Sequence, residues 1–328
     1  MTIRRILTTV DATSGGPGGT ARWCAAWASI FPADVVAIHF ASVSDWPLPF
    51  VTTRPCSGDG DAWWLADIGE RLHDTWVRSI ESAGVPVRVA LLHGNVEQVL
   101  CAAAREHQVD LVVLGGGHMG RLGVDVLADM AHHILAELER PVLVVRGRVI
   151  EPGDGPVIVA VDGGVEARTA LEEGVRWAEL TRSRLIACTS IQLGHAPPEV
   201  LEPFRAREIA TARADLDHML SPLRERDIEC EGLVVAGHDR PGTQVADVAA
   251  SHQASVLVVG SRSGLGALVS SCSQQLSVHA PCPVLIVPAV IRRGSALSGN
   301  ASAETSSLPL PDAAPAQASL RPIGGHSR

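Results

Sequence analysis

The chain has 328 residues, about twice the length of an ordinary domain, so two domains are expected. Hydrophobic residues make up 46% of the chain, charged residues make up 19%, and the formal net charge is -9. Such a surface repels phosphate backbones, which argues against nucleic acid and anionic membranes as partners. All 27 basic residues are arginine, so mechanisms that need a lysine, such as the Walker A phosphate clamp, are excluded.

The cysteines and the N-terminal residues indicate the compartment. Seven cysteines are scattered and never spaced as C-x-x-C, which argues against a disulfide framework or a zinc site and favours a reducing cytosol. The start, MTIRRILTTVD, has too short an apolar run for a signal peptide and is expected to form a first strand. No apolar stretch approaches the ~20 residues of a membrane helix. The sequence therefore predicts a soluble, cytoplasmic protein without a metal site.

Three segments of the first half recur in the second half in the same order. The matched pairs are ILTTVD at 6–11 with VIVAVD at 157–162, LVVLG at 111–115 with VLVVG at 256–260, and PVLVV at 141–145 with PVLIV at 283–287. The offsets between matched positions fall from 151 (162 − 11) to 145 (260 − 115) and 142 (283 − 141). A shared order with slowly shrinking offsets indicates that one unit was duplicated and then lost a few residues.

The apolar runs predict the strands, because each run is continuous, as in a parallel sheet covered by helices on both faces. In the first half the expected strands lie near 5–11, 35–42, 86–92, 110–115 and 141–146. A flexible loop at 14–19 is expected before the first helix, and further helices are expected at 61–82, 95–107 and 124–138. In the second half the expected strands lie near 156–162, 184–190, 229–236, 255–260 and 283–288, with helices at 165–181, 197–224, 242–252 and 270–280. This alternation predicts an α/β, Rossmann-like fold of two tandem doubly wound parallel five-stranded sheets.

Two stretches fall outside the repeat and set the domain boundaries. Residues 43–60 are rich in Pro, Gly and Ser and are expected to form a long loop. Residues 291–328 have few bulky apolar side chains, so they are expected to be a disordered tail. The expected domains are residues 1–148, called the first copy below, and residues 149–290, called the second copy.

Several motifs together resemble the universal stress protein family. They are a first strand that ends in Val-Asp, a Gly-rich loop after the fourth strand, a helix, and a closing strand that begins at a proline. The second copy matches most clearly, with VIVAVDGG at 157–164, VLVVGSRSGLGALVSSCSQQL at 256–276 and HAPCPVLIVP at 279–288. The resemblance covers residues 1–288 and implies a stress-response protein with a fold like that of the adenine nucleotide alpha hydrolases. It also implies that the two closing strands pair across a pseudo-twofold axis as an intramolecular pseudo-dimer, which leaves a homodimer open.

The resemblance implies a nucleotide site in the second copy, with ATP as the candidate ligand and no magnesium evident from the sequence. In the family the Asp that closes the first strand approaches adenine, and the pattern G-x2-G-x9-G-[ST] after the fourth strand cradles ribose and phosphates, using glycine backbone N–H groups and a helix N-terminus. A three-residue deletion shortens this loop and displaces its second glycine, and an arginine can pair with phosphate in compensation. The implied residues are Asp162, Gly163, Gly260, Ser261, Arg262, Gly264, Ser270, Ser271 and Ser273.

A plainer interpretation of the same loop stays open, in which Ser270 only caps a helix and the glycines only make a tight turn. In the first copy both hydroxyl positions are lost, because counting back from the closing Pro141 places Ala128 and Asp129 there. That copy therefore has a weaker candidate site, which consists of Asp11, Gly115, Gly117 and Gly120.

The leading hypothesis is a stress-response regulator that binds ATP or another adenine nucleotide in its second copy. No general base, activated nucleophile or metal cluster is evident, so no catalytic residue is assigned and at most weak ATP hydrolysis is expected. One alternative is a nucleotide-free dimerising scaffold of the same fold. Another is an enzyme of the ATP-pyrophosphatase type that uses the SGGPGG loop at 14–19, although the Asp-Ser that should follow this loop is missing. His132 and His133 are interpreted as a helix face rather than metal ligands, and Trp63, Trp64 and Trp76 as buried helix faces.

Overall fold

A computed structural model describes residues 2–10, 19–40, 72–92, 95–115, 124–146, 149–194, 198–261 and 272–289. These residues belong to one compact unit that spans residues 1–294. Within them, no helix is both long enough and apolar enough to cross a membrane. The expected loop at 43–60, the first part of the expected helix at 61–82 with Trp63 and Trp64, and the expected tail at 291–328 lie outside the described residues.

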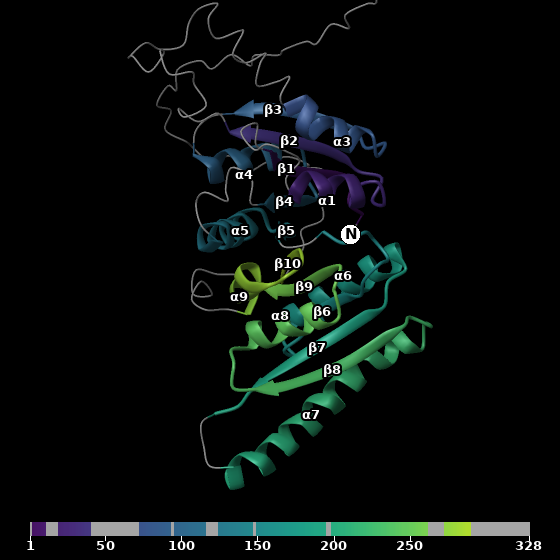
Figure 1. The fold of residues 1–328 in the computed structure, drawn as a ribbon, viewed down its shortest axis with the longest axis vertical. Coiled ribbons are helices and arrows are strands. Elements are labelled where there is room, and N and C mark those ends of the chain that lie inside the picture. Colours follow the sequence, from purple (N-terminus) through teal and green to yellow (C-terminus); the bar gives the residue numbers. More distant parts are fainter. Residues whose placement is uncertain are drawn as a thin grey trace, which may run out of the picture. The chain divides into compact units, whose positions relative to one another are not determined.

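Strands and helices alternate along both copies (Figure 1). The elements of the first copy are β1 (Arg5–Val10), α1 (Gly19–Trp27), β2 (Asp34–Phe40), the π-helix η2 (His73–Val77), α3 (Arg78–Glu81), β3 (Val87–Leu92), α4 (Val96–Glu106), β4 (Leu111–Gly115), α5 (Val124–Leu138) and β5 (Val142–Val145). Those of the second copy are β6 (Val157–Ala160), α6 (Val165–Thr181), β7 (Leu185–Gln192), α7 (Pro198–Arg224), β8 (Cys230–Gly237), α8 (Pro241–Ser251), β9 (Val256–Ser261), α9 (Cys272–His279) and β10 (Val284–Pro288). All ten predicted strands are confirmed, with ends that differ by at most two residues.

The ten strands form a single sheet in the order β3-β2-β1-β4-β5-β10-β9-β6-β7-β8, which can be followed in Figure 1. Within each copy all neighbouring strands are parallel, as predicted for doubly wound sheets. The two five-stranded sheets are joined because β5 and β10 pair in antiparallel fashion, and we call this pairing the seam. Leu143 faces Leu285 there, with Val142 opposite Ile286 and Val144 opposite Val284. Leu143 and Leu285 are corresponding positions, 142 apart (285 − 143), and the counterparts of Val142 and Val144 at the same offset are Val284 and Ile286, so the seam is symmetric about Leu143 and Leu285.

Helices cover both faces of this sheet, and each face has its own buried core. One core joins side chains of α1, α3, α6 and α7 to the sheet, and the other joins side chains of α4, α5, α8 and α9 to the opposite face. The strands at the centre, such as β4, β5 and β6, are buried at every residue. Burial on both faces explains why these strands read as continuous apolar runs in the sequence.

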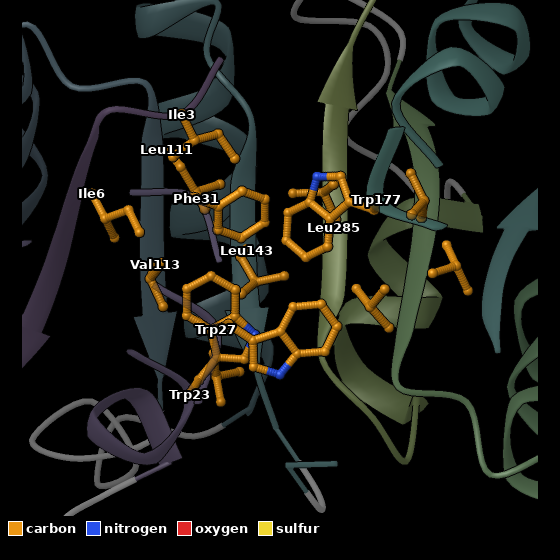
Figure 2. Close-up of a cluster of buried hydrophobic side chains, with 14 of the residues drawn as sticks. Ile3, Ile6, Trp23, Trp27, Phe31, Leu111, Val113, Leu143, Trp177 and Leu285 are labelled. Carbon is orange, nitrogen blue, oxygen red and sulfur yellow. The ribbon is translucent and has the colours of Figure 1, made fainter. Parts of the chain in front are cut away.

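Four aromatic side chains pack across the seam on the α1 and α6 face, and we call them the aromatic layer. Trp23, Trp27 and Phe31 of the first copy surround Trp177 of the second copy, with ring centroids 6.1, 5.5 and 5.1 Å from the Trp177 ring (Figure 2). All four side chains are at most 3% exposed. Close aromatic pairs of this kind contribute about 0.5–1.5 kcal/mol each beyond the area they bury, so the layer is a main source of cohesion between the copies.

A buried carboxyl group supports the aromatic layer from within α6. Glu173 is 2% exposed, and its Oε1 accepts a hydrogen bond from Trp177 Nε1 at 3.2 Å. Burial raises the pKa of Glu173 from its usual value of 4.5 to about 7, an effect that the Trp177 hydrogen bond opposes and that the charge of Glu172 increases. Arg176 Nη2 lies 2.9 Å from Glu173 Oε2, but the Arg176 side chain is 30% exposed, so solvent weakens its hold on the carboxylate.

Candidate functional site

The candidate site of the second copy begins where β6 and β9 end side by side. These strands are parallel neighbours, with Ala160 opposite Val259, so Asp162 and Gly260 follow at the same edge of the sheet. The chain leaves β6 toward β7 and β8 on one side and then crosses to β9 on the other. This is the topological switch point at which open α/β sheets bind their ligands. The structure thus brings together two residues that the sequence placed in one site.

Asp162 and Gly163 form the turn from β6 into α6. Asp162 is exposed, and its Oδ1 accepts a hydrogen bond from the Gly164 N–H at 3.0 Å. Gly163 has a φ of +78°, which a side chain would disfavour, and nothing lies within 4 Å of the place a Cβ would take. Glycine is therefore required here by the turn, and the carboxylate of Asp162 stays at the surface beside the start of α6.

Gly260 has a packing role that the sequence did not indicate. A Cβ at this position would lie 2.6 Å from the carbonyl oxygen of Glu166 and 2.7 Å from its carbonyl carbon. The end of β9 therefore touches the backbone of the first turn of α6, and any side chain at Gly260 would force these elements apart. Ser261, the last residue of β9, is 5% exposed.

Helix α9 starts close to the same edge. Burial, together with the negative charge of Asp162, raises the pKa of the Cys272 thiol to about 11. The first residue of α9 therefore lies within electrostatic reach of the Asp162 carboxylate. A raised pKa also means that the thiol stays protonated at neutral pH, so Cys272 is not an activated nucleophile.

Ser273 has a protein partner from the other copy. It is 2% exposed, and its Oγ lies 2.9 Å from Nε2 of His132, a residue of α5 that is itself 8% exposed. The sequence placed Ser273 among the nucleotide-binding residues, and it placed His132 on a helix face rather than in a metal site. Neither expectation contained this contact, because nothing in the sequence relates residues 141 positions apart in two different copies.

The first copy uses a similar close approach at its own switch point. A Cβ on Gly115, at the end of β4, would lie 2.4 Å from Cγ2 of Thr20 in the first turn of α1. The carbonyl oxygen of Val10 at the end of β1 contacts His39 Nδ1 at 3.2 Å, and the corresponding carbonyl of Val161 accepts a hydrogen bond from Thr189 at 3.0 Å. The two copies therefore share this architecture, although a buried imidazole in the first copy takes the place of a hydroxyl in the second.

The remaining predicted site residues lie outside the described part of the chain. They are Arg262, Gly264, Ser270 and Ser271 of the second copy, together with Asp11, Gly117 and Gly120 of the first. The glycine loop considered for pyrophosphatase chemistry, residues 14–19, also lies outside it except for Gly19. Among the residues that the structure does describe, no cluster of three or more His, Cys, Asp or Glu side chains could hold a metal ion.

Two surface hollows formed by described residues lie away from the switch point. One, of about 540 Å³, is lined by Val149, Ile150, Glu151, Asp154 and Gln253. These residues belong to the connection between the copies and to the segment before β9, which is the amino end of the sheet. The other, of about 260 Å³, lies between α6 and the end of α7. Neither contains a residue of the candidate site, so the topology of the strand ends, rather than these hollows, locates it.

Comparisons with known proteins point to one family. The family model described as the universal stress protein family matches the chain twice, at residues 2–146 and 155–288. Universal stress proteins from two strains of Mycobacterium tuberculosis, CDC 1551 and H37Rv, are each 24% identical to the chain over 213 residues, which is 64% of this chain and 73% of theirs.

Solved structures agree with this at the level of the fold. A universal stress protein from Archaeoglobus fulgidus is 16% identical, with a TM-score of 0.61 over 87% of this chain and 96% of that protein. A functionally unknown protein from Pseudomonas aeruginosa PAO1 is 17% identical, with a TM-score of 0.55 over 87% of this chain and 92% of that protein. These likenesses extend over both copies.

Proposed function

Because the chain belongs to the universal stress protein family, we propose that it is a stress-response regulator that binds an adenine nucleotide, with ATP as the first candidate, in its second copy. The observation that carries the proposal is the meeting of Asp162, Gly163 and Gly260 at the switch point between β6 and β9. An exposed carboxylate can accept a hydrogen bond from the adenine amino group, and Gly163 leaves open space where a side chain would stand.

The roles of the other residues follow from the loop between β9 and α9. Arg262 would pair with phosphate oxygens, and Ser270 and Ser271 would donate hydroxyl hydrogen bonds to them at the start of the helix. Asp162 would meet the base, and Gly260 and Gly264 would admit the phosphates. No side chain of the described site is placed to act as a general base or a nucleophile, so we propose binding rather than turnover, with weak ATP hydrolysis at most.

Calorimetric titration of the full chain with ATP tests this proposal. We expect wild-type protein to bind ATP with a Kd below about 1 mM, and Ser271→Asp to abolish binding by placing a carboxylate where the phosphates should lie. Asp162→Asn should weaken binding, whereas the matched change Asp11→Asn in the first copy should not. Absence of binding by the wild-type chain at millimolar ATP would disprove the proposal.

A nucleotide-free scaffold is the second candidate, and the close packing at the strand ends favours it. Both Gly115 and Gly260 lie where a Cβ would collide with a neighbouring helix, so their presence has a structural reason without any ligand. The single sheet and the aromatic layer also show that the copies serve each other as packing partners. A scaffold predicts that neither Asp162→Asn nor Ser271→Asp changes any ligand affinity. Loss of ATP binding only on changing Gly15 or Gly16 would instead favour the pyrophosphatase type.

A further inference from the structure

Side chains of the first copy contact the N-terminal turn of α9 in the second copy. His132 Nε2 lies 2.9 Å from Ser273 Oγ, and both residues are buried. One turn earlier on α5, Asp129 Oδ1 accepts a hydrogen bond from Gln274 Nε2 at 2.8 Å, near the surface. We call these two contacts the polar layer, because they join the copies on the face of the sheet opposite to the aromatic layer.

The first copy also holds the other end of the same helix. Arg146, which directly follows β5, donates from Nη1 to the carbonyl oxygen of Ser277 at 3.0 Å and to that of Val278. Carbonyl groups in the last turn of a helix lack partners within the helix, and a guanidinium group both satisfies them and complements the negative end of the helix dipole. Residues of the first copy therefore contact α9 at both ends.

The hydrogen bonds of His132 fix its role in this contact. Its Nδ1 lies 2.8 Å from the carbonyl oxygen of Ala128, which can only accept, so Nδ1 carries the ring proton. In the neutral form of the ring, Nε2 has a free lone pair and accepts a hydrogen bond from the Ser273 hydroxyl. Removing either partner leaves a buried polar atom without this bond, which makes the contact sensitive to the exact side chain.

Helix α9 is short, and both copies hold it in place. It has eight residues, whereas isolated helices shorter than about 12 residues are marginal in water. Its buried residues are Ser273, Leu276 and Ser277, so only one large apolar side chain anchors it. Within its own copy, Gln275 Oε1 accepts a hydrogen bond from the N–H of Gly242 in α8 at 3.1 Å. A Cβ on Gly242 would lie 2.4 Å from Gln275 Cβ, so α8 packs closely on α9, and the position of α9 depends on α8 of its own copy together with α5 of the first copy.

The start of α9 lies at the same sheet edge as the candidate nucleotide site, because α9 joins the parallel strands β9 and β10 and therefore begins at the carboxyl end of β9, where Gly260 and Asp162 lie. We propose that His132 of the first copy is a positioning residue, which holds α9 through Ser273 and thereby sets the adenine-nucleotide affinity of the second copy. This inference rests on the proposed function. It gives the first copy, whose own site has lost the phosphate-binding hydroxyls, a part in binding at the second.

ATP titrations of the full chain with His132→Ala and a matched control test the inference. We expect His132→Ala to weaken ATP binding about tenfold, within the usual range of coupling between sites. His132→Gln, whose amide oxygen can accept from Ser273 near the place of Nε2, should restore binding to within about threefold of wild type. Trp27→Phe removes a hydrogen bond from Trp27 Nε1 to the Ile150 carbonyl on the opposite face of the sheet, and it should leave ATP affinity unchanged.

A double-mutant cycle separates positioning from direct contact. If Ser273 acts only through His132, ATP binds the double variant His132→Ala with Ser273→Ala about as tightly as it binds either single variant. If Ser273 contacts the nucleotide itself, the two losses multiply, and the positioning role fails. An ATP affinity of His132→Ala equal to wild type, or an equal loss in Trp27→Phe, would also overturn the inference.

Hydrogen exchange makes the test independent of the ligand. The amides of residues 272–279 should exchange several-fold faster in His132→Ala than in wild type or Trp27→Phe, because α9 opens more often without its buried partner. Exchange at the wild-type rate would overturn the positioning role. If wild-type protein does not bind ATP at all, the proposed function fails and with it the link to affinity, and the exchange rates alone then decide whether His132 holds α9.

Discussion

Helices α1 and α6 occupy equivalent places in the two copies, yet they support the seam with different chemistry. Trp27 and Trp177 lie 150 positions apart (177 − 27), the offset at which His39 and Thr189 also correspond (189 − 39). The centroids of their rings lie 5.5 Å apart. In α1 the residue one turn before the shared tryptophan is Trp23, which stacks on Trp27 at 5.9 Å.

In α6 the corresponding residue is Glu173, a buried carboxyl group that accepts a hydrogen bond from the shared tryptophan. The two helices therefore hold the same indole in two ways, by stacking in the first copy and by hydrogen bonding in the second. Stacking does not depend on pH, whereas a buried carboxyl group does. Duplication kept the contact and changed what supports it.

Removing the shared tryptophan from either helix should have the largest effect. Both Trp27 and Trp177 are fully buried, so Trp177→Ala and Trp27→Ala should each lower the free energy of unfolding by about 3–5 kcal/mol. Urea denaturation followed by circular dichroism measures this change. Trp177 touches three aromatic rings of the other copy, so its loss should be at least as costly as that of Trp27. A loss below about 1 kcal/mol in either variant would mean that the aromatic layer does not join the copies.

The pH dependence of stability should differ between the two supports. The folded-state pKa of Glu173, about 7, lies above its usual 4.5, so the unfolded chain ionises first as pH rises. Wild-type protein should therefore lose stability relative to Glu173→Gln between pH 4.5 and pH 7, by at most about 3 kcal/mol, with no further relative change above pH 7. Chemical denaturation of both proteins across this range measures the difference, and Glu106→Gln, at an exposed position in α4 on the opposite face of the sheet, is the control. A constant difference across the range would contradict the prediction.

A smaller change should isolate the hydrogen bond of the α1 tryptophan. Trp27 Nε1 donates to the carbonyl oxygen of Ile150 at 3.0 Å, in the connection between the copies. Trp27→Phe keeps an aromatic ring but loses this bond and some ring area, and it should cost about 1–2 kcal/mol. Thermal unfolding should show this intermediate loss. A cost as large as that of Trp27→Ala would show that the hydrogen bond, rather than ring packing, dominates at this position.

The smallest effect on the free energy of unfolding is expected from Arg176, the partly exposed partner of Glu173. Below pH 7 Glu173 is mostly protonated, and the Arg176 side chain is 30% exposed. Arg176→Ala should therefore change the free energy of unfolding at pH 6 by less than about 1 kcal/mol, while raising the pKa of Glu173 further. Chemical denaturation at pH 6 and pH 8 distinguishes the two effects, since the loss should grow at the higher pH. An equal loss at both would mean that Arg176 acts by packing alone.

The backbone architecture could be predicted from the sequence, because strands that are buried on both faces are continuous runs of apolar residues. Continuous runs such as LVVLG and VLVVG are what a strand covered on both faces requires, and both lie where they were expected. The family resemblance predicted that the closing strands pair across a pseudo-twofold axis, and the antiparallel pairing of β5 and β10 confirms it. The helix expected at 61–82 was only partly described, and residues 73–77 form a π-helix, a widening that no sequence signal predicted.

The candidate site was harder to predict from the sequence, because the roles of its residues depend on contacts with residues that are distant in the chain. Asp162 and Gly163 could be placed at a strand end, since local turn chemistry marks them. The sequence took Gly260 as an opening for phosphate, whereas its closest neighbour is the Glu166 backbone. The contact of Ser273 with His132 had no signal at all, because it depends on how α5 and α9 pack across the seam.

The symmetry of the seam has a consequence for how the two halves can change. In a dimer of identical subunits every contact away from the twofold axis occurs twice, so one substitution alters two places. Here the positions that correspond to His132 and Ser273 across the seam, 142 apart, are Gln274 and Ala131, which cannot repeat the same bond. The contact is therefore made once, and each half is free to carry its own member of the pair. Joining two copies in one chain thus releases the interface from self-complementarity and lets one half specialise while the other supports it.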